Sequence, residues 1–117
     1  MKSAITLSLL AAALALSATS ALASGDPVAG KAKAVTCVAC HGQDGNSVDP
    51  QYPRLAGQYA DYMEQALHEY KTGQRDNPIM KGFASQLSDQ DIANVAAYFS
   101  QMPGKLDDLK GHIQGDN

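Results

Sequence analysis

The chain has 117 residues, a formal net charge of −3, no Trp and two Cys. A chain of this length forms one small domain, and so small a core is marginally stable unless another group adds apolar surface. The mildly acidic balance argues against a nucleic-acid binder, which would present a basic face, and against tight docking on an anionic membrane.

Residues 1–23 have the pattern of an export signal peptide. Lys2 gives a basic start, residues 4–16 are mostly apolar, and residues 21–23 fit a small-x-small cleavage site. The alternative is an uncleaved membrane anchor, but the apolar run is shorter than the roughly 20 residues that span a bilayer. We therefore expect cleavage before Ser24, a periplasmic location and no stable membrane insertion. Cleavage removes one basic residue and leaves a formal charge of −4.

Residues 27–37 are predicted to form the first helix of the mature chain. Asp26 can cap its N-terminus and Pro27 suits its first turn. The segment is rich in Ala, which favours a helix, and Gly30 would let another helix approach the backbone closely.

Residues 37–41 read Cys-Val-Ala-Cys-His, the spacing by which c-type haem is attached. Each thiol, on Cys37 and on Cys40, adds to one vinyl group of the haem and forms a thioether. The two intervening residues let a single backbone turn present both sulfurs, and His41 then lies under the ring, where its imidazole can bind the iron. One covalent haem c would also supply the apolar surface that the core lacks.

Other sites with two cysteines fit the sequence less well. A thioredoxin-like redox pair needs a βαβ setting, and no strand pattern lies nearby. A structural zinc site needs four ligands at suitable spacing, whereas His68 and His112 have no paired spacing. A plain disulfide in an exported protein is the third alternative.

The following segment, residues 42–53, is predicted to be a loop because it is rich in turn-forming residues. A histidine that binds iron usually donates its other ring N–H to an acceptor that fixes the ring. The carbonyl of Pro53 is our candidate acceptor for His41, and an ordinary loop proline is the alternative.

A second helix is predicted over residues 57–71, where apolar side chains recur at helical spacing. These are Tyr59, Tyr62, Met63, Ala66, Leu67 and Tyr70. Met63 is therefore expected in the core and His68 in solvent, and Gly73 is expected to end the helix.

Residues 74–83 are predicted to be irregular, because Pro78 and Gly82 interrupt them. An irregular segment can bend to place a sulfur over the iron, so Met80 is the candidate for the second axial ligand. Met also fills gaps in cores, and Met102, beside Pro103, is a weaker candidate.

The last helix is predicted to begin at Ser88, where Ser88 and Asp91 resemble a capping box. Its apolar face is made of Ile92, Val95, Ala96 and Phe99. We expect this face to cross the first helix near Gly30. Pro103 and Gly104 end the helix, and residues 104–117 form a polar tail.

Taken together, these features resemble class I c-type cytochromes, in particular short bacterial monohaem proteins similar to single halves of dihaem periplasmic cytochromes. The matching segments are Gly25-Asp26-Pro27 with Gly30, residues 37–41, residues 53–58, residues 77–80 and residues 87–98. The resemblance implies an all-α cytochrome c fold, with three main helices around one covalent haem, over residues 24–103.

The resemblance also implies a role for each site residue. Cys37 and Cys40 would carry the thioethers, and His41 and Met80 would be the axial ligands. Pro53 would accept the hydrogen bond of His41, and Leu55 would pack on the haem. The first helix has Ala34 where many relatives carry an aromatic residue, so its helix contact is expected to be leaner.

These implications favour a soluble periplasmic electron carrier of a respiratory chain rather than an enzyme. Its expected partners are redox proteins such as a cytochrome bc-type complex, a terminal oxidase or a periplasmic reductase, and we expect a monomer. One alternative is a haem-bearing subunit of a larger respiratory oxidoreductase complex. The other is a ligand-binding haem protein, if the Met80 site is open.

Overall fold

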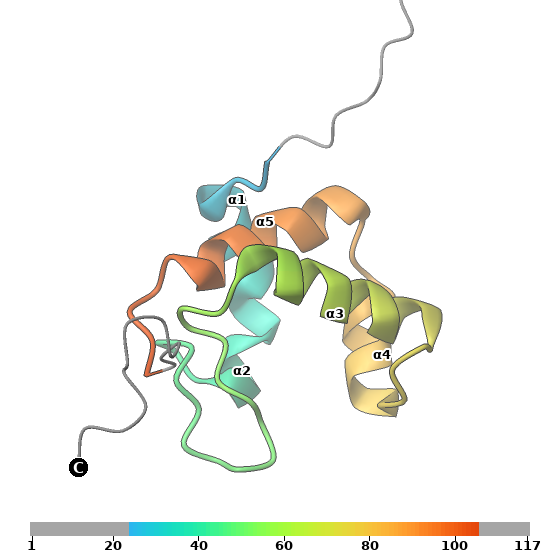
Figure 1. Cartoon of the computed structure of the whole chain (residues 1–117), viewed down its shortest axis with the longest axis horizontal. Helices are drawn as coiled ribbons and strands as arrows, with labels where there is room; N and C mark the ends of the chain where they lie inside the picture. Colours follow the sequence, from blue (N-terminus) through green and yellow to red (C-terminus); the bar gives the residue numbers. More distant parts are fainter. Residues whose placement is uncertain (1–23, 106–117) are drawn as a thin grey trace, which may run out of the picture.

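The computed structural model describes residues 24–105. Every element in this part of the chain is helical, which confirms the predicted all-α fold (Figure 1). The elements are α1 (Pro27–Lys33), a 3₁₀ turn η1 (Ala34–Thr36), α2 (Val38–His41), α3 (Ala60–Thr72), α4 (Pro78–Ala84) and α5 (Asp89–Ser100). No helix within 24–105 is long and apolar enough to cross a membrane. The predicted signal peptide and residues 106–117 of the tail lie outside the described residues.

The segment predicted as one helix over residues 27–37 begins at Pro27 as expected, but only α1 is α-helical and the last part of the segment is the 3₁₀ turn η1. The predicted cap is present, because the carboxylate of Asp26 accepts the N–H of Val28 at 2.8 Å. The α-helix then tightens into a 3₁₀ turn that contains Val35 and Thr36. Two consecutive β-branched residues lose side-chain freedom in an α-helix, which is a physical reason for the break there.

The backbones of α1 and α5 touch where the two helices cross. A Cβ added to Gly30 would collide with the carbonyl oxygen of Asn94, and one on Gly25 would collide with that of Ala93. The buried Asn94 side chain also accepts the N–H of Asp26 at 2.8 Å. The predicted crossing near Gly30 is therefore confirmed.

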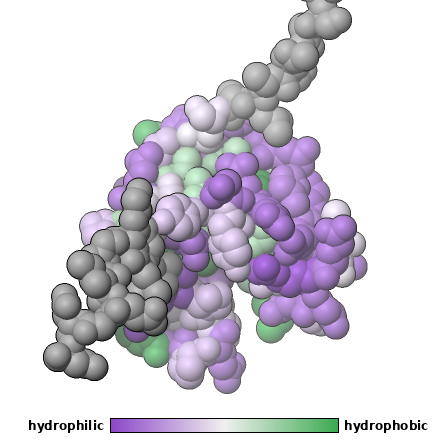
Figure 2. All heavy atoms as spheres, viewed as in Figure 1, coloured by the Kyte–Doolittle hydropathy of each residue, from purple (hydrophilic) through white to green (hydrophobic). Residues whose placement is uncertain are grey.

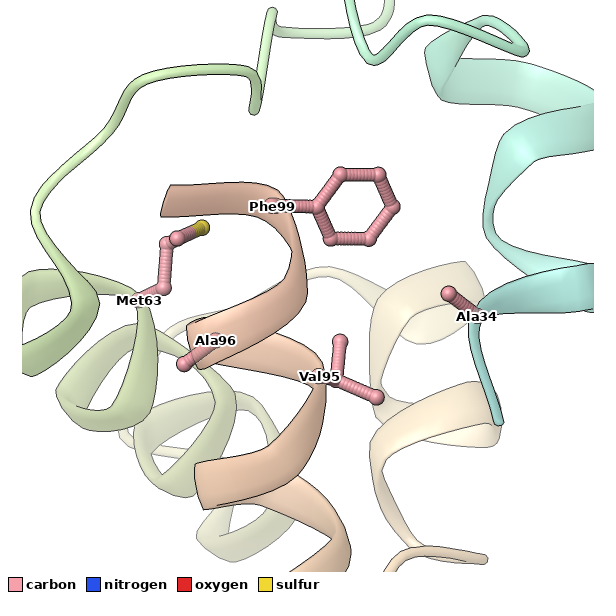
Figure 3. Packing of buried hydrophobic residues seen from close by; sticks show 5 residues of the cluster. All are labelled: Ala34, Met63, Val95, Ala96 and Phe99. Carbon is pink, nitrogen blue, oxygen red and sulfur yellow. The ribbon is translucent and has the colours of Figure 1, made fainter. Parts of the chain in front are cut away.

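The core lies between α5, α3 and the haem motif. Its central members are Ala34, Met63, Val95, Ala96 and Phe99. In Figure 3, Val95 points toward Ala34, and Ala96 lies on the side of α5 that faces Met63. Met63 is only 6% exposed and Phe99 is fully buried. The prediction that Met63 is a core residue is confirmed.

Helix α3 begins later than predicted, at Ala60, because Gly57 has a left-handed φ of 76° that no α-helix contains. Its predicted end is confirmed, since Gly73 has a φ of 84° and caps the last turn. Helix α5 has the predicted capping box, in which the Ser88 hydroxyl accepts the N–H of Asp91 at 3.1 Å. The Asp91 carboxylate reaches back to the N–H of Ser88 at 3.1 Å.

Helix α4 corrects the prediction that residues 74–83 are irregular. Its N-terminus is capped by Asn77, whose side-chain oxygen accepts the N–H of Met80 at 3.0 Å. Pro78 occupies the first turn, where its missing N–H costs nothing. Gly82 lies inside the helix. Pro78 is thus part of a helix start and not a helix breaker.

Candidate haem site

The two cysteines lie on one short helical turn. Cys37 is the N-cap of α2 and Cys40 lies inside that helix. Both thiols are half-buried, and neither forms a disulfide. The N–H of His41 donates to the carbonyl of Cys37 at 3.0 Å, which closes the turn. Burial raises the pKa of the Cys37 thiol, and hydrogen bonding with Thr36 only partly opposes this.

His41 is buried, with 6% of its surface exposed. Its Nδ1 lies 2.7 Å from the carbonyl oxygen of Pro53, the acceptor that the sequence suggested. A carbonyl can only accept, so Nδ1 carries the proton, and in the neutral imidazole Nε2 then keeps a lone pair for a metal. The ring of Tyr52 stands edge-on to the imidazole, with the centroids 6.3 Å apart.

The loop that carries Pro53 is held in place at several points. The carbonyl of Gly45 accepts the N–H groups of Leu55 and Ala56 at 2.8 and 3.0 Å. The buried side chain of Asn46 donates to the Pro103 carbonyl and accepts the N–H of Lys105, both at 3.0 Å. The segment after α5 thus holds the loop in place through hydrogen bonds. The loop in turn fixes the position of the Pro53 carbonyl, which accepts the hydrogen bond of His41.

Leu55 lies at the edge of the core next to the haem motif. It is partly buried and packs on the same core cluster as Cys37 and Val38. Leu55 thus packs on the same core cluster as the haem motif, and its packing on the haem itself stays a prediction.

Met80 is partly exposed on α4, as Met102 is after α5, whereas Met63 is buried. Met63 is buried in the core, and Met102 packs against the core from the segment after α5. The same helix as Met80 also exposes two large apolar side chains, Ile79 at 64% and Phe83 at 40%. Exposed apolar area of this kind gains free energy if a hydrophobic group covers it.

The arrangement fits one covalent haem c. Figure 2 shows a hollow between the part of the molecule that holds α2 with the 42–57 loop and the part that holds α4. Two free thiols, one turn apart, and an imidazole with an available Nε2 belong to α2. A partly exposed thioether belongs to α4. A thioether and an imidazole are a known axial pair for haem iron.

The alternatives to haem gain no support from the described residues. Within 24–105, no three His, Cys, Asp or Glu side chains gather into a metal-binding group. His68 lies at the surface, with its Nδ1 3.9 Å from a carboxylate oxygen of Asp89. His112 lies outside the described part of the chain. The described chain also has no strands for a thioredoxin-like setting.

Sequence reasoning missed two residues near the candidate ligands. Asn77 holds the backbone of Met80, and the pair Asn77-Pro78 is a recognisable helix-start signal. Tyr52 packs on the ring of His41. No local pattern marks Tyr52, because its contact depends on the path of the loop.

A profile of the cytochrome c family matches residues 27–103. Cytochrome c4 of Pseudomonas aeruginosa is 51% identical over 78 residues, which cover 67% of this chain and 39% of that protein. Cytochrome c-554(548) of Halomonas halodenitrificans is 49% identical over 79 residues, which cover 65% of this chain and 95% of that protein.

The similarity extends to three-dimensional structure. The crystal structure of reduced recombinant cytochrome c4 from Pseudomonas stutzeri aligns with a TM-score of 0.66 and 42% identity, over 70% of this chain and 48% of that chain. The chain thus spans less than half of these two cytochrome c4 proteins, but it covers nearly all of the relative from Halomonas.

Proposed function

The chain belongs to the cytochrome c family, and on this basis we propose that it is a periplasmic electron carrier whose one covalent haem c is held by His41 and Met80. Cys37 and Cys40 form the thioethers in this proposal. The observation that carries it is the hydrogen bond from His41 Nδ1 to the Pro53 carbonyl, which leaves Nε2 available to iron. The partly exposed thioether of Met80 on α4 would hold the iron together with His41.

Each residue has a defined part in the proposed mechanism. The bound haem iron supplies a one-electron couple. The Pro53 carbonyl fixes the orientation of the His41 ring and makes Nε2 a stronger donor. A Met80 thioether raises the reduction potential relative to a second histidine. With both ligands held by packed helices, little of the protein has to move when the charge changes.

The partners in this proposal are redox proteins that exchange electrons with the chain in brief encounters. Such encounters use small interfaces, and the exposed apolar side chains of α4 suit one. Donors and acceptors of the kind expected from the sequence are a cytochrome bc-type complex, a terminal oxidase or a periplasmic reductase. Membership of a larger respiratory complex is the alternative, and it predicts co-purification at a fixed stoichiometry.

An optical spectrum of the purified protein, oxidised and reduced, tests the assignment of the ligands. We expect a c-type haem spectrum with the weak sulfur-to-iron band in the oxidised form. Met80→Ala should abolish this band, whereas the matched control Met102→Leu should keep it.

Other outcomes would overturn the ligand assignment. A band that persists in Met80→Ala would mean that another residue binds the iron. A wild-type protein that lacks the band and binds carbon monoxide when reduced would have an open site instead. A colourless protein would exclude haem attachment.

A further inference from the structure

The connection between α3 and α4 turns back on α3 before it enters α4. Gly73 ends α3 in a left-handed conformation. The N–H of Arg75 then donates to the carbonyl of Glu69, one turn inside the helix, at 3.1 Å. The chain is therefore anchored to α3 at Arg75, only a few residues before Met80.

The side chain of Arg75 strengthens this anchor. Its Nη2 lies 3.2 Å from Oε2 of Glu69. Its guanidinium carbon lies 5.2 Å from the ring centroid of Tyr70 and 5.9 Å from that of Tyr62. Hydrogen bonds with Tyr70 and then Tyr62 raise the pKa of Arg75. The planar guanidinium thus spans two aromatic rings and one carboxylate of α3, which a lysine ammonium cannot reproduce.

Only four residues separate the anchor at Arg75 from the candidate ligand Met80. Asn77 follows Arg75 after one residue and caps α4. Its side-chain oxygen holds the N–H of Met80 at 3.0 Å. At the other side of the turn, the ammonium of Lys81 lies close over Gly73, 3.3 Å from where a Cβ would stand. The chain is thus held to α3 at Arg75 and capped at the start of α4 beside Met80.

We propose that Arg75 is a positioning residue, which holds α4 against α3 so that the sulfur of Met80 stays on the haem iron. This inference rests on the proposed function, because it takes Met80 as the axial ligand. A ligand is held well only when the residues around it are themselves fixed. Loss of the Arg75 anchor leaves α4 attached by fewer contacts, so the sulfur leaves the iron more often.

The test compares Arg75→Gln and Arg75→Lys with Lys33→Gln in the haem-loaded protein. Lys33→Gln is a matched control, because it removes an ion pair of similar length, 3.3 Å to Asp91, that joins α1 to α5 instead. The oxidised proteins are heated while the sulfur-to-iron band and the helical circular dichroism are followed together. Carbon monoxide binding to the reduced proteins is measured as a second readout.

In wild type and in Lys33→Gln, we expect the band and the helical signal to be lost at the same temperature. In Arg75→Gln, the band should be lost at a lower temperature than the helices, and carbon monoxide should bind at least about tenfold faster. In Arg75→Lys, the temperature at which the band is lost and the rate of carbon monoxide binding should lie between those of wild type and Arg75→Gln. Lysine restores the positive charge but not the planar guanidinium.

Two results would overturn the proposal. The first is an Arg75→Gln protein whose band and helices melt together and whose carbon monoxide binding matches wild type. The second is a Lys33→Gln protein that behaves like Arg75→Gln, which would mean that any lost ion pair has this effect. Failure of the proposed function looks different, because wild type itself would then lack the band.

Discussion

The ring Nδ1 of His41 lies 2.7 Å from the carbonyl oxygen of Pro53 and joins helix α2 to the far end of the loop that follows it. Here the loop determines the orientation of the imidazole, since the carbonyl fixes both the proton on Nδ1 and the direction of Nε2. The rigidity of residues 42–57 therefore bears directly on the iron.

We expect Pro53→Ala to affect both stability and reduction potential. The alanine keeps the carbonyl but frees the backbone, so the free energy of unfolding should fall by about 0.4–1 kcal/mol. The looser acceptor should also shift the reduction potential. Pro50→Ala is the control, because Pro50 is exposed in the same loop and has no bond to the ring. Denaturant unfolding and potentiometry measure the two effects, and equal potentials in both variants would contradict this role of Pro53.

The helix crossing gives a pair of opposed predictions. A Cβ on Gly30 would collide with the carbonyl of Asn94, whereas nothing lies within 4 Å of a Cβ on Gly82. Gly30→Ala should therefore lower the free energy of unfolding by about 1–3 kcal/mol, the usual cost of overpacking. Gly82→Ala should raise it by about 0.5–1 kcal/mol, because alanine favours the helix interior. Denaturant unfolding of both variants checks this, and a tolerated Gly30→Ala would mean that the helices do not touch there.

Much of the fold could be predicted from the sequence because its determinants are local. Asp26 and Ser88 mark helix starts within a few residues of themselves, and both caps are present. The Cys-x-x-Cys-His spacing likewise predicts a single turn that presents both thiols, and α2 is such a turn. The crossing near Gly30 was predictable because a small residue on a helix surface permits close approach.

The missed features have physical reasons. Helix α4 is hard to predict because a proline can interrupt a helix or, after a capping Asn, occupy its first turn, as Pro78 does. The break after α1 depends on two opposed helix propensities, the low one of Val35-Thr36 and the high one of the Ala-rich residues before them. The difference is too small for propensity alone to predict where the α-helix ends. The contacts of Arg75 join the connection after α3 back to the side of α3. No periodic pattern encodes such a contact.

The capping box of α5 should make stability depend on pH. Hydrogen bonds from the Ser88 side chain and then its backbone lower the pKa of Asp91, with Lys33 adding to the effect. A carboxyl whose pKa is lower when folded stabilises the fold above its unfolded pKa, about 3.9, and loses this effect as pH falls through the folded pKa. Asp91→Asn should therefore cost about 0.3–1 kcal/mol at pH 7.

The difference between wild type and Asp91→Asn should shrink below about pH 4. Thermal unfolding across pH 2–7 measures it. Asp61→Asn serves as the control, because Asp61 also lies in the first turn of a helix, α3, but its carboxylate accepts the N–H of Tyr62 at 2.8 Å and takes part in no capping box. A difference that stays constant down to the lowest pH would show that the charge of Asp91 is not what stabilises the helix start.

The cap of α4 offers a prediction that connects helix stability to the iron. Asn77→Ala removes the acceptor of the Met80 N–H, and loss of such a cap costs about 1 kcal/mol. Because that N–H belongs to the proposed ligand, the fraying should also weaken the bond from sulfur to iron. Asn77→Asp should restore both properties, since aspartate is an equally good cap. The measurements are thermal unfolding and the sulfur-to-iron band of the oxidised protein. If Asn77→Ala lowers stability but leaves the band as temperature-resistant as the helices, the cap would serve the fold alone.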